Sequence, residues 1–218
     1  MTRPNRRTLL AAAVLIGPTL ACSSGCVSLT ANLIRMVKGN DVPPEYEGLK
    51  DQTIVVVCSD EKGYCQSDAT NQVSRSLQTI ITNKLRKATV VPQSRIDNWI
   101  ASDAESADVA PQIGRALSAD VVILVDFRGM KLHDGATMYR GKSDLTVELF
   151  DVKKGEVAFR KNLHGYTYPQ NAAISRTEMD ESKFQRIYLN EVAIRVSQLF
   201  VPSPMGSEIA TDAKILGY

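Results

Sequence analysis

Two uninterrupted apolar runs most limit how this chain can fold. Residues 54–57 and 121–125 contain only valine, isoleucine and leucine. Such runs are typical of strands that are covered on both faces, and strands of that kind form the centre of sheets with helices on each side. At 218 residues the chain is long enough for one such core plus a leader, since domains hold about 150 residues. A single α/β domain is therefore predicted.

The stretch after the first run has the order strand, helix, strand, helix. Residues 69–87 place their apolar side chains on one stripe at helical spacing. A short strand over residues 89–91 ends at Pro92, and two brief helices are expected, one after Ser94 and one near Pro111. This order predicts right-handed crossovers between parallel strands.

The second half of the chain changes from continuous apolar runs to alternation. Leu145, Val147 and Leu149 alternate with polar residues, which is typical of a strand with one covered face and one wet face. With a turn at residues 153–155, the pattern predicts three antiparallel strands between residues 120 and 165. The predicted fold class is thus α/β, with a mixed sheet made of a parallel βαβ first half and an antiparallel three-strand meander, followed by a long C-terminal helix.

The domain organisation follows from these elements and from the composition between them. A loop over residues 166–181 leads to the last helix, which is expected over residues 182–201. The predicted parts are a signal peptide (1–25), a lipid-anchored short helix and spacer (26–52), the α/β domain (53–201) and a polar tail (202–218).

Residues 1–25 have the composition of an export signal. A basic start that includes Arg6 and Arg7 is followed by an apolar run over residues 9–16, which a Gly-Pro pair at 17–18 interrupts. The run is too short for a membrane-spanning helix, which needs about 20 apolar residues. Arg6 and Arg7 also resemble the twin-arginine export motif, so general and twin-arginine export both stay open.

Two cysteines directly after the apolar run resemble the acceptor of a bacterial lipoprotein. We favour Cys26, with Cys22 as the alternative, because cleavage before Cys26 leaves Cys58 and Cys65 as an even pair. Acyl chains on the new N-terminus would hold the protein on a membrane without a spanning helix. An ordinary secreted protein with a disulfide among these cysteines is the competing interpretation.

The residue after the favoured acceptor bears on which membrane is used. Val27 stands where some lipoproteins carry the aspartate that retains them in the inner membrane. The expected location is therefore the periplasmic face of the outer membrane.

Cys58 and Cys65 are the most specific chemical feature of the remaining chain. Cys58 ends the first strand, Cys65 lies in the following loop, and Gly63 between them allows the chain to fold back. In an exported protein this spacing predicts a disulfide. The alternative is that Cys58 is a buried free thiol.

No residue pattern in the chain predicts catalysis or a cofactor. His133 and His164 are the two histidines, and neither has a neighbour at metal-ligand spacing. Residues 141–143 read Gly-Lys-Ser but precede a strand, so they do not form a phosphate loop. Acidic residues at 60–61, 103–105 and 180–181 lie in polar loops or caps and are expected to be solvated. No catalytic residue, metal site or cofactor is predicted.

The net charge excludes nucleic acid as the expected partner. The whole chain has 26 basic and 24 acidic residues, but loss of the signal removes three arginines and no acid. The exported chain then has 23 basic and 24 acidic residues, without the basic excess of a nucleic-acid-binding domain.

Three features in order resemble a family of envelope proteins. They are the opening apolar strand with a helix behind it, the joint Ile-Gly-Arg-Ala-Leu-Ser-Ala-Asp-Val-Val at 113–122, and the strand-turn-strand Leu-Phe-Asp-Val-Lys-Lys-Gly-Glu-Val at 149–157. This order resembles the periplasmic α/β domain of peptidoglycan-synthase-activator lipoproteins, the curli-secretion lipoprotein and the N-terminal domain of the Tol-system propeller protein. Ser118 replaces the glycine of that family's joint. The resemblance spans residues 53–201 and implies a lipoprotein that binds other envelope proteins.

The functional hypothesis combines the leader, the spacer and the resemblance. We expect an exported, lipid-anchored, non-catalytic protein that binds or scaffolds another envelope component. The alternatives are an envelope hydrolase that uses loop carboxylates and an accessory subunit of an export or transport assembly.

Overall fold

A computed structural model describes residues 41–65, 67–103 and 108–205. The export motif with Arg6 and Arg7, the lipid acceptor candidates Cys22 and Cys26, and most of the polar tail lie outside the described residues. Those predictions therefore rest on the sequence alone.

The core of the protein is one mixed sheet, which confirms the predicted α/β class. The strand order is β3-β2-β5-β6-β7, and β4 and β8 pair with β2 and β6. β2 runs parallel to β4 and β5, whereas the pairs β5–β6 and β6–β7 are antiparallel. The strands of this sheet are β2 (Thr53–Asp60), β3 (Gly63–Tyr64), β4 (Thr89–Val90), β5 (Val121–Asp134), β6 (Met138–Asp151), β7 (Glu156–Tyr168) and β8 (Ile174–Ser175). Two further short strands, β1 (Asp41–Val42) and β9 (Ser203–Pro204), lie outside it.

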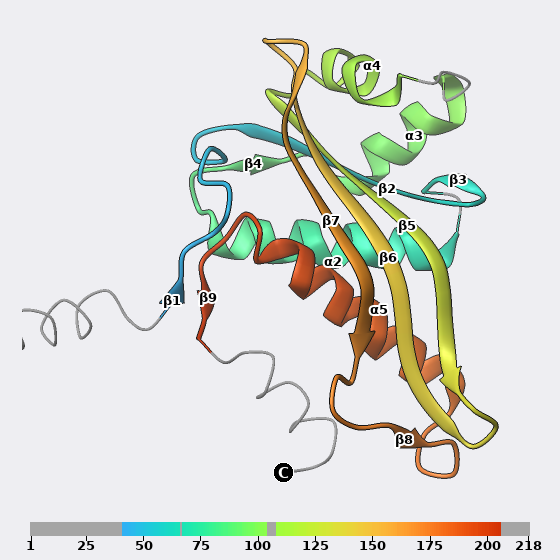
Figure 1. Ribbon diagram of the computed structural model, residues 1–218. Coiled ribbons are helices and arrows are strands. Elements are labelled where there is room, and N and C mark those ends of the chain that lie inside the picture. The colour runs from blue at the N-terminus through green and yellow to red at the C-terminus, as the bar shows by residue number, and fades with distance from the viewer. Residues whose placement is uncertain (1–40, 66, 104–107, 206–218) are drawn as a thin grey trace, which may run out of the picture. The chain divides into compact units, whose positions relative to one another are not determined.

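Two long helices cover one face of this sheet (Figure 1). They are α2 (Asp68–Lys84) and α5 (Glu181–Ser197). Side chains at their N-terminal caps fix where they begin: Ser67 and Thr70 form a capping box at α2, and Asp180 accepts from the Lys183 amide at α5. Between helices and sheet lies the larger core cluster, which includes Val56, Ile123, Val147, Leu149, Phe184 and Tyr188.

Two shorter helices cover only part of the opposite face. They are α3 (Gln93–Asp103) and α4 (Val109–Ala116), and they bury the outward side chains of the parallel pair β2 and β5. On β6 and β7 the same face stays more open, since Phe150 is only partly buried and Arg160 is exposed. The outer half of the meander is therefore left without a helix on this side (Figure 1).

The folded part begins earlier than the sequence predicts. Leu49, which we assigned to a spacer, is 1% exposed and belongs to the larger core cluster. The backbone amide of Tyr46 donates to the Leu199 carbonyl at 2.9 Å, and its ring packs against Phe159 and Phe200. The end of the proposed spacer is thus part of the domain, because its apolar side chains join the larger core and pack against β7 and the residues that follow α5.

The joint before β5 fastens three segments together. The Asp120 carboxylate accepts from the Thr53 amide at 2.9 Å and forms an ion pair with Lys153 at 2.8 Å. These contacts connect the starts of β2 and β5 to the turn between β6 and β7. Ser118, where the resembling family has glycine, has a φ of +54°, a conformation that favours glycine. The joint at residues 113–122 therefore has a structural role.

Candidate functional site

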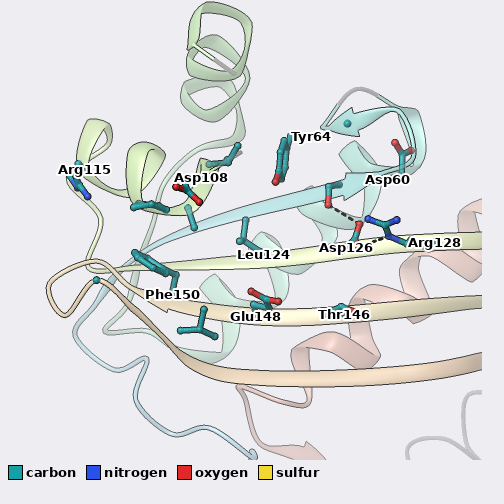
Figure 2. Close-up of a pocket in the computed structure, with 17 residues that line it drawn as sticks. Asp60, Tyr64, Asp108, Arg115, Leu124, Asp126, Arg128, Thr146, Glu148 and Phe150 are labelled. Atoms are coloured by element: carbon teal, nitrogen blue, oxygen red, sulfur yellow. Dashed lines mark hydrogen bonds and ion pairs between the residues drawn. The ribbon is translucent and has the colours of Figure 1, made fainter. Parts of the chain in front are cut away.

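A groove lies where the partial helix cover of the sheet stops (Figure 2). Its volume is about 670 Å³, which is within the range of ligand and peptide sites. The β2–β3 hairpin and the start of α4 form one wall, and the outward face of β5, β6 and β7 forms the floor. Residues that line it include Ser59, Asp60, Tyr64, Asp108, Arg115, Leu124, Asp126, Arg128, Thr146, Glu148, Phe150 and Val157.

Strand alternation places the floor residues. Successive side chains of a strand point to opposite faces, so Thr146, Glu148 and Phe150 lie outward while their neighbours Val147 and Leu149 are buried in the larger core. The pairing of β5 with β6 continues this surface sideways to Leu124 and Asp126.

A tight hairpin places Tyr64 on the groove wall. Gly63 has a φ of +117°, which is open to glycine and strained for other residues. The chain then returns along β2, and the Cys65 amide donates to the Cys58 carbonyl at 2.8 Å. The Tyr64 ring consequently packs against a smaller core cluster beneath α3 and α4, which includes Val55, Val57, Ile113 and Val122, and it borders the groove (Figure 2).

Ion pairs organise the floor. Asp126 accepts from the Ser59 hydroxyl at 3.1 Å and from Arg128 Nε at 2.6 Å. Glu148 pairs with Arg160 Nε at 2.9 Å. Both acids are therefore held in fixed positions by neighbours on the same face of the sheet.

The Tyr64 wall has a negative electrostatic environment. The pKa of Tyr64 is raised, first by burial and then by the charges of Asp126, Glu148 and Asp108. Negative charges raise the pKa of a phenol because they disfavour its anion. Three carboxylates, from β5, from β6 and from the residue before α4, thus act together at this side chain.

The histidines and the remaining predicted polar residues lie elsewhere. His133 contacts Glu181 at 3.3 Å and the Tyr139 ring, and His164 Nδ1 is 3.9 Å from Asp144. Among the described residues, no group of three His, Cys, Asp or Glu side chains could hold a metal.

Several residues of the Gly-Lys-Ser stretch and of the acidic stretches have a defined place in the fold. Gly141 and Ser143 lie in β6, where the Ser143 hydroxyl is 2.6 Å from that of Tyr188 in α5. Asp180 caps α5, whereas Asp60, expected to be solvated, lines the groove.

Cys58 and Cys65 lie side by side in the hairpin as free thiols. Burial raises the pKa of Cys58 well above its ordinary value, and the nearby Cys65 raises it further, whereas a hydrogen bond with Ser74 lowers it. Gln93 donates to Cys65 Sγ at 3.6 Å. The predicted disulfide is not formed in this structure, and the pairing stays a prediction for oxidising conditions.

The main groove residues were not found from the sequence. Tyr64, Asp108, Glu148 and Phe150 come from four separate stretches that carry no shared motif. The alternation in residues 145–149 predicted that every second side chain faces water. These outward-facing positions were the one local signal for the floor of the groove.

No helix within the described ranges is both long enough and apolar enough to cross a membrane.

Comparison with known proteins gives similarity of fold only. The sequence matches no protein-family model and no curated protein. Among solved structures, the PelC dodecamer from Paraburkholderia phytofirmans is 14% identical, with a TM-score of 0.43 over 74% of this chain and 95% of that chain. Lipoprotein GNA1162 from Neisseria meningitidis is 10% identical, with a TM-score of 0.41 over 66% and 97%. The LpoB C-terminal domain from Salmonella enterica is 14% identical, with a TM-score of 0.39 over 66% and 94%. No residue role is carried from these proteins to this chain.

Proposed function

We propose that this chain is an exported, lipid-anchored, non-catalytic protein that docks another protein of the cell envelope through its groove. The observation that carries this proposal is the half-covered sheet face, where a groove of about 670 Å³ borders partly buried apolar side chains. The leader with Cys26, or alternatively Cys22, supports the envelope location.

The composition of the groove supports docking. Tyr64, Leu124 and Phe150 are partly buried and pack on the smaller core, and Val157 is 42% exposed. Aromatic and aliphatic side chains surrounded by polar residues are typical of protein interfaces. Rigid strands hold these residues, so little conformational entropy is lost when a partner binds.

The ion pairs of the floor also support docking. Asp126 and Glu148 each have an arginine partner. Complementary charges across an interface select the partner and orient it.

Site-specific photo-crosslinking in cells tests the docking function. A photoreactive amino acid at Val157 would lie in the groove, and the same residue in place of the exposed Arg86 is the matched control. We expect a discrete adduct with an envelope protein from position 157 and none from position 86. No adduct from position 157, or the same adducts from both positions, would contradict the proposal.

Intact-mass measurement tests the anchor. We expect mature protein that begins at Cys26 and carries the mass of its acyl chains, and Cys26→Ala should abolish this modification whereas Cys22→Ala should not. An unmodified N-terminus in the membrane fraction would contradict the lipid anchor.

A further inference from the structure

We infer that the groove selects a partner segment that presents a basic side chain next to an apolar one, with the basic group at Tyr64 and the apolar group at Phe150. This inference rests on the proposed docking function and adds the chemistry of the partner. The supporting observation is that acidic and apolar side chains line one continuous groove (Figure 2).

The wall of the groove provides the cationic subsite. Four carboxylates and two arginines line the groove, and Arg160 pairs with Glu148 from the neighbouring strand, which leaves one carboxylate in excess. Asp108, Asp126 and Glu148 line the same groove as Tyr64 (Figure 2), and their charges contribute to the raised pKa of Tyr64. A lysine or arginine that contacts the Tyr64 ring would gain both cation–π attraction and the field of these carboxylates.

The floor provides the apolar subsite. Phe150 and Leu124 lie on adjacent strands, and the exposed Val157 is the register partner of Phe150 on β7. Covering these side chains removes apolar surface from water and is favourable. Glu148, a carboxylate of the cationic subsite, precedes Phe150 by two residues on one strand face, so the two subsites adjoin each other.

The same charges argue against anionic occupants. A nucleic acid or an anionic lipid surface would bring phosphates toward Asp60, Asp108 and Glu148, and the like charges would repel. Arg128 is already engaged by Asp126 at 2.6 Å. A basic and apolar protein segment is therefore the occupant that this lining fits.

Titration of the protein with short peptides tests the partner chemistry without the natural partner. The probes are N-acetyl-Lys-Leu-Lys-amide and N-acetyl-Glu-Leu-Glu-amide, added to the ¹⁵N-labelled mature chain in a neutral detergent. We expect the lysine peptide to shift the amide resonances of Tyr64, Asp108 and Glu148, and this effect should weaken at high salt. The glutamate peptide should leave them unchanged.

Charge-neutralising variants make the test specific. Asp108→Asn and Glu148→Gln together should weaken the apparent affinity for the lysine peptide by about tenfold, since two nearby opposite charges are lost. Glu178→Gln removes an exposed charge that does not line the groove, and it should have no effect.

Two outcomes would overturn the inference. One is equal shifts with the glutamate peptide, and the other is shifts of these amides with phosphatidylglycerol vesicles but not with the lysine peptide. These outcomes differ from failure of the docking function itself. A crosslinked partner in cells together with no lysine preference would keep the docking function and reject the partner chemistry.

Discussion

The two faces of the sheet differ in how completely helices cover them. Along β6, Leu145, Val147 and Leu149 are at most 1% exposed beneath α2 and α5, whereas Glu148 and Phe150 on the other face are only partly buried. Neighbouring residues of one strand therefore have different roles. The covered face holds the fold together, and the partly covered face presents side chains to a partner.

A pair of substitutions on β6 gives the largest expected contrast. Leu149→Ala should lower the free energy of unfolding by about 3 kcal/mol, because it opens a cavity in the larger core. Phe150→Ala should cost only about 1 kcal/mol, because the ring is partly in contact with water already. Urea denaturation followed by circular dichroism measures both. Equal losses would contradict the difference between the faces.

Gly141→Ala tests how tightly the covered face is packed. A Cβ at this position would overlap the ring of Tyr188, which is fully buried and hydrogen-bonded to Ser143. We expect a loss of about 2 to 3 kcal/mol, typical of overpacking. Gly135→Ala is a control for the glycine change at an open position, although its φ of +71° adds strain. A thermal unfolding temperature equal to that of the wild type would show that the α5 packing is loose.

Asp120→Asn tests the joint before β5 independently of the two faces of the sheet. It should lower stability by about 1 to 2 kcal/mol, because the amide keeps the shape but loses the charge-assisted bonds. The bond with Lys153 is the largest cause of the lowered pKa of Asp120, followed by the Thr53 amide.

The pH dependence of this difference has a defined sign. A lowered pKa in the folded state means that the contribution is present above the ordinary carboxyl pKa of 3.8 and is lost as the pH falls through the folded-state pKa. The gap between wild type and Asp120→Asn should therefore close on acidification below about pH 4. A gap that is constant with pH would contradict this role of the Asp120 charge.

Ser118→Gly should give the smallest effect, with the opposite sign. Ser118 is exposed and has a φ of +54°, so glycine relieves backbone strain there. We expect stabilisation of about 0.5 to 1 kcal/mol after the entropy cost of glycine. Chemical denaturation checks it, and a destabilised variant would show that the serine side chain has a role of its own.

Local patterns predicted much of the fold. The buried runs at 54–57 and 121–125 lie in the adjacent parallel strands β2 and β5, and the alternation around Val147 marked the covered and wet faces of β6. The fold-back at Gly63 was expected, but the short strand β3 and the buried Leu49 were missed, because short strands and single apolar residues give no periodic signal.

The groove could not be predicted in the same way. Tyr64, Asp108 and Phe150 are far apart in the chain, and each one alone has an ordinary local context. Asp60 was expected to be solvated, and nothing in its local sequence indicated that it lines a groove. The site exists because α3 and α4 cover β2 and β5 but reach β6 only at its Phe150 end, and the length of a helix cover is a property of packing.

The sequence by itself determined the strand cores and the helix faces, because each depends on residues that are near one another in the chain. The tertiary structure alone decided which carboxylates meet at Tyr64 and which apolar side chains remain half-exposed. Periodicity records whether a side chain points inward or outward. Whether an outward side chain meets a helix, a partner or water depends on segments distant in sequence.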